Sequence, residues 1–239
     1  MNFRLLTGLV LLLVFVTAVA CQDSKDKTST TTGSTTSSQS SFEVWAVDQS
    51  GTSDGPTAEF GGLIYIWDGA DISENASEAT PEIIDLVVAA SEAGCDAPKK
   101  PHMVLANDNR LHNSFTPIPK ASHIILANVG SGDTFFINIK SRTIVGCVNT
   151  IGGFNGTGGT ANTHAATASA DNSMVIVANI GAKGESGYLH KIQTDYTNDK
   201  YSFVETLALD QFSNDLGTSV ARPICHEFTV DSKFAYVTM

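Results

Sequence analysis

Basic residues are scarce in this sequence: Lys and Arg number 14 against 25 Asp and Glu, and the net charge is −11. Proteins that bind nucleic acids or anionic lipid head groups do so largely through clustered Lys and Arg side chains. We therefore expect no nucleic-acid partner. The segment 42–239 is nevertheless long enough to bury one sizeable hydrophobic core.

Cysteines are few and widely spaced: the chain has Cys21, Cys95, Cys147 and Cys225. No pair has the CxxC spacing, which argues against a zinc knuckle and against a thioredoxin-type redox pair. If Cys21 is modified, as argued below, three cysteines remain. An oxidising compartment then permits one disulfide and leaves one thiol over, and spacing alone leaves the three possible pairings open.

Long amphipathic helical patterns are also missing after residue 41. The nearest is 80–94, whose Thr-Pro-Glu start is typical of a helix N-terminus, whereas its Ile and Val residues are equally compatible with a strand. We predict a strand followed by a loop there. Elsewhere short β-rich runs alternate with Gly, Asn, Asp and Ser, which predicts an antiparallel all-β domain.

The N-terminus has the features of a secretion signal. Arg4 precedes an apolar run over 5–16 that is too short for a comfortable membrane span, and Ala-Val-Ala stands directly before Cys21. This placement resembles the lipobox of bacterial lipoproteins, whose cysteine is lipidated, although Ala18 stands where Leu is usual. The alternative is an ordinary signal peptide with an incidental cysteine. We expect a signal peptide over 1–20 and lipid attachment at Cys21.

The next segment fits a lipid anchor. Residues 28–41 are almost wholly Ser and Thr, a composition that cannot bury apolar surface. We expect 21–41 to be a disordered tether between the membrane and the domain. Gln22, rather than Asp, follows the cysteine, which resembles the sorting pattern of outer-membrane lipoproteins. The expected location is therefore extracytoplasmic, anchored to a bacterial outer membrane and facing the periplasm or the cell surface.

Short strands recur in sets along the rest of the chain. Residues 122–153 show an apolar strand, a Gly-Ser-Gly-Asp turn, a second strand, a polar turn and a third strand. Residues 172–211 repeat this order with longer turns, and 42–87 follow it loosely. A further set begins at 232–239. The sequence therefore predicts repeated units of three to four antiparallel strands.

The spacing of the units points to one architecture. Asn128 and Asn179 are 51 positions apart, and Thr238 follows 59 positions later, which is typical of β-propeller blades. The strand endings IILAN, VIVAN and AYVTM resemble the YVTN-type repeats of seven-bladed surface-layer-like and YncE-like propellers. This resemblance implies a β-propeller over 42–239. Because only about three and a half units are visible, we expect an incomplete N-terminal portion of a longer propeller.

Histidines precede several of the repeated strands. His112, His164 and His226 stand before IILAN, VIVAN and AYVTM, and His102 precedes a similar strand, HMVLAN. Inner strands line the channel of a propeller, so these imidazoles are candidate ligands of a transition metal such as copper. The arrangement is similar to those of nitrous oxide reductase and the selenium-binding and methanethiol oxidase propellers. The alternative is that the histidines are structural features of the repeat.

Other polar residues are weaker candidates. Glu227, Asp108 and Arg110 lie beside these histidines and could act in proton transfer or support a ligand, although rim residues of this kind are more often simply solvated. His123 and His190 fall within outer strands by pattern. We expect them to be surface or packing residues.

Three functions are compatible with these features. The first is a noncatalytic module that binds a small ligand or a protein on the propeller face. The second is a metal-dependent oxidoreductase of the copper type that uses His112, His164 and His226. The third is a structural surface-layer-like protein. Fold alone does not decide among them.

Overall fold

A computed structural model describes residues 42–49, 60–107, 121–213 and 219–239. Cys21, Asp108, Arg110 and His112 lie outside these ranges, as does the predicted tether. No helix among the described residues is long and apolar enough to cross a membrane.

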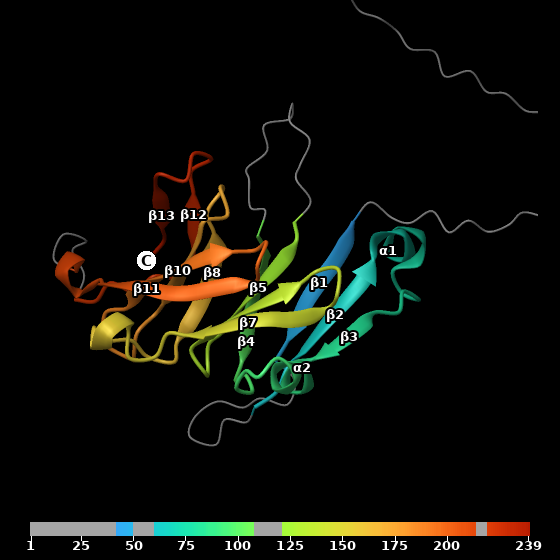
Figure 1. The fold of residues 1–239 in the computed structure, drawn as a ribbon, viewed down its shortest axis with the longest axis horizontal. Helices are drawn as coiled ribbons and strands as arrows, with labels where there is room; N and C mark the ends of the chain where they lie inside the picture. Colours follow the sequence, from blue (N-terminus) through green and yellow to red (C-terminus); the bar gives the residue numbers. More distant parts are fainter. Residues whose placement is uncertain (1–41, 50–59, 108–120, 214–218) are drawn as a thin grey trace, which may run out of the picture. The chain divides into compact units, whose positions relative to one another are not determined.

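The described residues form four antiparallel sheets, in which neighbouring strands follow one another along the chain (Figure 1). The first sheet contains β1 (Glu43–Asp48), β2 (Leu63–Asp68) and β3 (Glu82–Asp85). The second contains β4 (Pro101–Ala106), β5 (His123–Asn128), β6 (Asp133–Asn138) and β7 (Thr143–Asn149). The third contains β8 (Thr163–Ala168), β9 (Met174–Asn179), β10 (Tyr188–Asp195) and β11 (Lys200–Ala208). The fourth contains β12 (His226–Phe228) and β13 (Ala235–Val237).

The sheets are arranged as blades of a β-propeller. The first strands of successive sheets contact each other in series, β1 with β4, β4 with β8 and β8 with β12. The remaining strands of each sheet follow in order away from this inner line, and β7 of the second sheet contacts β11 of the third. The predicted all-β propeller with blades of three to four antiparallel strands is therefore confirmed.

The first sheet departs from the regular pattern in one respect. Gln49, just after β1, bonds to His102 at the start of β4, whereas Glu43 at the beginning of β1 pairs with Arg142 in the turn after β6. That turn lies at the end of the second sheet where β4 stops. Hence β1 runs opposite to β4, while β8 starts beside the start of β4.

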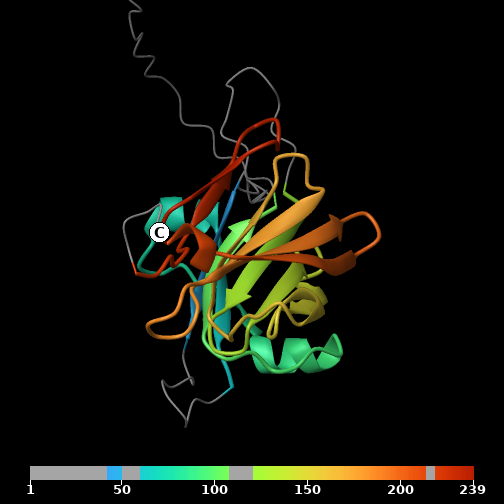
Figure 2. The same ribbon diagram turned by 90° about the vertical axis from the view of Figure 1, so that its left-hand side faces the viewer.

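Sheet stacking explains the apolar strands of the second and third blades. Every residue of β5 is buried, including those on both faces, because the strand lies between two neighbouring sheets (Figure 2). One core cluster lies between the first and second sheets and the other between the second and third. In the latter, Tyr201 stacks on Phe136, with ring centroids 3.7 Å apart, in a space that a side chain at Gly146 would fill.

Four short helices occur in the part of the chain that the structure describes. They are α1 (Gly69–Asn75), α2 (Leu86–Glu92) and the 3-10 turns η1 (Phe154–Gly156) and η2 (Asp210–Phe212). The prediction for 80–94 was right for the strand β3 and wrong for the loop, which is α2. Asp85 caps this helix by accepting hydrogen bonds from the backbone N–H groups of Val87 and Val88, and Leu86 and Ala90 share the buried side.

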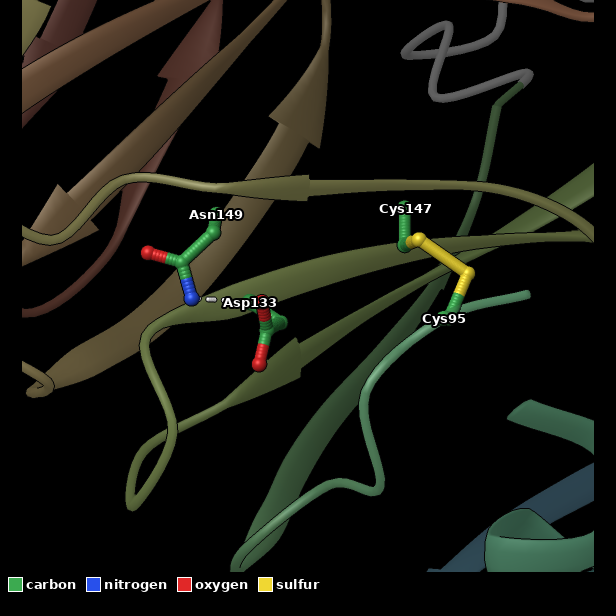
Figure 3. The surroundings of a disulfide bond; sticks show 4 residues. All are labelled: Cys95, Asp133, Cys147 and Asn149. Atoms are coloured by element: carbon green, nitrogen blue, oxygen red, sulfur yellow. Dashed lines mark hydrogen bonds between the residues drawn. A yellow bond between two sulfur atoms is a disulfide. The ribbon is translucent and has the colours of Figure 1, made fainter. Parts of the chain in front are cut away.

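One disulfide links Cys95, in the segment after α2, to Cys147 in β7 (Figure 3). The bond links the segment that follows the first sheet to β7, the outer strand of the second sheet. The two cysteines are 52 residues apart in the sequence. Cys225 is free and partly buried. The pairing left open by spacing is therefore Cys95 with Cys147, with Cys225 as the remaining thiol among the described cysteines.

Removing the disulfide with the double variant Cys95→Ala/Cys147→Ala should lower the free energy of unfolding by about 4 kcal/mol, because the open chain regains the entropy of a loop of this length. Urea unfolding followed by circular dichroism measures the change. Cys225→Ala is the matched control and should change stability far less. Equal losses in the two variants would contradict the prediction.

Candidate functional site

Two of the predicted histidines meet at the inner line of the propeller. His102 of β4 and His164 of β8 place their Nε2 atoms 3.1 Å apart, and their rings are tilted by 60°. His102 is exposed and His164 is partly buried. The two residues are 62 positions apart in the sequence and come from consecutive blades.

A repeated β-bulge presents both rings. Pro101 pairs with Asn128 and Met103 with Ala127, which leaves His102 as the extra residue of β4. The same irregularity in β8 leaves His164 extra between Thr163 and Ala165. A bulge interrupts strand alternation and re-aims a side chain, and such irregularities are common at the rims of barrels and next to active sites.

This register changes the correspondence expected from the sequence. Spacing matched His164 with His112, whereas the pairing of the strands shows that His102 is its counterpart in the preceding blade. Counting residues back from the repeated Asn does not find equivalent histidines, because the loop between β4 and β5 is longer than the loop between β8 and β9.

The same position in the fourth sheet is occupied by Ile224. His226 pairs with Val237, the N–H of Thr238 donates to the carbonyl of Cys225, and the N–H of Ile224 donates to the carbonyl of Thr238. Cys225 is thus the partner of Thr238, as Ala165 is of Ala178, and Ile224 is the extra residue. Ile224, not His226, is the counterpart of the histidine pair.

The hydrogen bonds of the pair define its tautomers. His164 Nδ1 lies 3.0 Å from the carbonyl oxygen of Ile224, which can only accept, so Nδ1–H is the donor. The Nε2 atom of neutral His164 therefore carries a lone pair and accepts from His102 Nε2–H. His102 Nδ1 in turn accepts from the side-chain amide of Gln49 at 3.1 Å. The chain of bonds requires two neutral imidazoles.

Electrostatics favour the same state. Burial, and then the neighbouring His164, lower the pKa of His102 below its ordinary value. A neutral imidazole with a lone pair directed at a neighbour is the form that binds metals and accepts protons. The pair is therefore suited to holding a cation or a hydrogen-bond donor.

His226 lies elsewhere. Its side chain is buried, packs edge-on against Phe228, and has no hydrogen-bond partner of good geometry for either ring nitrogen within the described residues. Burial lowers its pKa to about 4, although the nearby backbone of Ile176 and Thr167 acts in the opposite direction. The ring belongs to the packing between blades.

Three further residues considered in the sequence lie within the described ranges. His123 and His190 are fully buried packing residues, bonded to Asp199 and Thr206 respectively. Glu227 lies in β12, next to His226. Within the described ranges, no three His, Cys, Asp or Glu side chains already lie close enough together to hold a metal ion.

A second polar site was missed from the sequence. Asp133, at the start of β6, is buried, and its carboxylate accepts a hydrogen bond of 2.7 Å from Asn149 (Figure 3). Burial raises its pKa, opposed by the hydrogen bonds from Asn149 and Ser131. It borders a cavity of about 310 Å³ that Lys99 also lines. A single Asp in a glycine-rich turn carries no pattern that predicts its burial.

No protein-family model matches the chain, and no curated protein matches its sequence. Among solved structures, the chain is similar to a crystal structure from Bacteroides fragilis that is provisionally described as a 6-phosphogluconolactonase. The TM-score is 0.48 and the identity 12%, over 86% of this chain. The match covers 50% of that structure, so this chain spans about half its length. The resemblance to YVTN-type repeats stays a prediction.

The buried histidines should make stability depend on pH. Burial lowers the pKa of both His190 and His226 to about 4, so the folded protein binds fewer protons than the unfolded chain. Their full contribution is present above pH 6.5 and is lost as the pH falls towards 4. When the pH is lowered from 7.5 to 5, each of the two histidines should lower the free energy of unfolding by about 2 kcal/mol.

Urea unfolding at the two pH values measures this loss. His226→Leu should remove the share of His226 and leave that of His190, so the drop in stability should be roughly halved. An unchanged drop in this variant would show that His226 is not the titrating group.

Proposed function

We propose that this chain is an extracytoplasmic, membrane-tethered β-propeller domain that binds a ligand where the inner strands begin, at His102 and His164. The observation that carries the proposal is the contact between the two Nε2 atoms, 3.1 Å apart, on equivalent bulges of consecutive blades. Repetition of a bulge that carries a histidine in two consecutive blades supports a role beyond packing, because a regular strand would serve packing equally well.

The accessibility of the pair supports binding. His102 is exposed and His164 is partly buried, in contrast to His123, His190 and His226, which are buried in the blades. A ligand from solvent can therefore approach the pair. Gln49 and the carbonyl of Ile224 orient the two rings from opposite sides.

The location is inferred from three features. The apolar segment before Cys21 resembles a lipoprotein signal, and the Ser/Thr-rich segment that follows suits a tether. The disulfide between Cys95 and Cys147 suits an oxidising compartment outside the cytoplasm. Together they favour an outer-membrane lipoprotein facing the periplasm or the cell surface.

A metal-dependent oxidoreductase of the copper type is the second candidate. One observation supports it: the hydrogen bond from His164 Nδ1 to Ile224 leaves Nε2 as a lone-pair donor, as in metal-binding histidines. Of the three ligands expected from the sequence, His164 belongs to the pair, His226 is buried elsewhere, and His112 lies outside the described residues.

Lipidation is tested by expressing the full-length chain in a diderm bacterium and separating membrane from soluble fractions. The native protein should sediment with the outer membrane, and Cys21→Ala should move to the soluble periplasmic fraction, because it has lost its acyl anchor. Cys225→Ala should behave like the native protein. Membrane association that survives Cys21→Ala would contradict lipid anchoring at this residue.

Ligand binding at the pair is tested by native mass spectrometry of the full-length protein purified from its natural host without chelator. We expect an additional bound mass on the native protein that is lost in His102→Ala and in His164→Ala. His226→Leu is the matched control and should keep it. Retention of the bound mass in both pair variants would overturn the proposed site.

A further inference from the structure

We propose that the chain has a second functional site, a serine-dependent ester hydrolase centre formed by Ser122, His123 and Asp199. Ser122 directly precedes β5 and His123 is the first residue of that strand. Because β5 runs antiparallel to β4, this site lies at the opposite end of the second sheet from His102. The proposal goes beyond ligand binding at the histidine pair and does not depend on it.

The three side chains form a continuous chain of hydrogen bonds. Ser122 Oγ lies 2.8 Å from His123 Nδ1, and His123 Nε2 lies 2.9 Å from Oδ1 of Asp199. Asp199 comes from the turn between β10 and β11, 76 positions along the sequence from His123. A hydroxyl, an imidazole and a carboxylate in this contact are the arrangement by which serine hydrolases are recognised, whatever their fold or sequence order.

The bonding sets the direction of proton transfer. A carboxylate can only accept, so His123 donates its Nε2–H to Asp199. Nδ1 of the neutral ring then carries the lone pair and accepts the hydroxyl proton of Ser122. In the most familiar triads the two ring nitrogens have the opposite roles, but the transfer needs only a lone pair facing the hydroxyl and an N–H facing the carboxylate. His123 is therefore placed as a general base towards Ser122.

Asn107 holds the serine in position. This residue directly follows β4 and is buried. Its Oδ1 accepts hydrogen bonds from the backbone N–H groups of Ser122 and His123, at 2.9 and 3.1 Å, and its Nδ2–H donates to Ser122 Oγ at 3.1 Å. The same amide has a second N–H, which can donate to an oxyanion that forms beside Oγ.

The nucleophile faces a cavity, whereas its base is buried. Ser122 is exposed and lines a cavity of about 470 Å³ together with Asn107 and Tyr196. This volume is typical of sites for small molecules. The ring of His123 is buried and packs against Tyr196, with ring centroids 5.0 Å apart. A substrate in the cavity can therefore reach the hydroxyl while the packing keeps the imidazole fixed behind it.

The cavity wall favours substrates without negative charge. Asp171 and Asp195 both line it. Hydrogen bonds from Ser169 and Ser173 lower the pKa of Asp171, and a hydrogen bond from the side chain of Asn198 lowers the pKa of Asp195. Both carboxylates are therefore ionised at neutral pH and repel an anionic acyl group. The substrate class that fits is an ester of an uncharged or cationic acid.

The reaction is an acyl transfer to water. Ser122 Oγ attacks the ester carbonyl carbon, and its proton passes to His123 Nδ1. The C–O bond to the alcohol then breaks, and the proton on Nδ1 goes to the departing alkoxide, which leaves an acyl-serine. A water molecule attacks the acyl carbonyl, and one of its protons passes through Nδ1 to Ser122 Oγ as the carboxylic acid leaves. Asp199 stays ionised and stabilises the imidazolium in both steps.

Covalent labelling tests for an activated serine. Full-length protein is treated with a fluorophosphonate, and the modified residue is identified by peptide mass spectrometry. We expect modification of Ser122 in the native protein and no labelling of Ser122→Ala. Ser173→Ala is the matched control and should be labelled as the native protein is, because Ser173 lines the same cavity but bonds to Asp171. An unlabelled native protein, or labelling that survives in Ser122→Ala, would overturn the proposed nucleophile.

Asp199 is a positioning residue, and labelling kinetics separate that role from a structural one. Asp199→Asn should lower the maximal labelling rate at least about 10-fold and leave the half-saturating probe concentration unchanged, because the cavity stays intact. Asp195→Asn, at a cavity carboxylate that precedes the same turn, should keep the native maximal rate. Equal maximal rates in native protein and Asp199→Asn would remove Asp199 from the site.

Turnover tests the hydrolase activity and the substrate class. Native protein should release 4-nitrophenol from 4-nitrophenyl acetate with a kcat/KM at least about 100-fold above that of Ser122→Ala. The anionic 4-nitrophenyl half-ester of glutaric acid should be hydrolysed about 10-fold less efficiently than the acetate. Equal turnover by native protein and Ser122→Ala would overturn the hydrolase, and a preference for the anionic ester would overturn the substrate class. Neither result affects ligand binding at His102 and His164.

Discussion

Face-to-face packing of adjacent sheets is the constraint on which the rest of this structure depends. Because β5 lies between two other sheets, both of its faces must be apolar, and every residue of that strand is buried. The stack of Tyr201 on Phe136 over Gly146 shows how close the second and third sheets come. This packing brings the starts of β4, β8 and β12 together, although about 60 residues separate His102 from His164.

The candidate site depends on β-bulges in the inner strands. In a regular strand, successive residues alternate between the two sheet faces, which are occupied by neighbouring blades. The bulges at His102 and His164 release one side chain per blade from that alternation. Two consecutive blades can then present their histidines at one end of the inner strands without disturbing the cores between sheets.

Burial separates the histidines into two groups. His190 and His226 lie in the cores, where desolvation holds their pKa near 4 and makes them neutral packing residues. His102 and His164 are accessible and bonded to each other, so they can exchange that bond for a ligand. Sequence patterns do not distinguish the groups, because a one-residue shift moves a strand side chain from one environment to the other.

The sequence by itself determined the all-β class, the repeated strands and their endings, because turn residues and apolar runs act locally. It also limited the disulfides to one once Cys21 is set aside. Only the tertiary structure decided that Cys95 pairs with Cys147, that 86–92 is helical, and that His102 contacts His164. These features depend on bulges, strand register and contacts between blades. Such contacts bring together residues that are distant in the sequence, and they produce no periodic pattern of residue types.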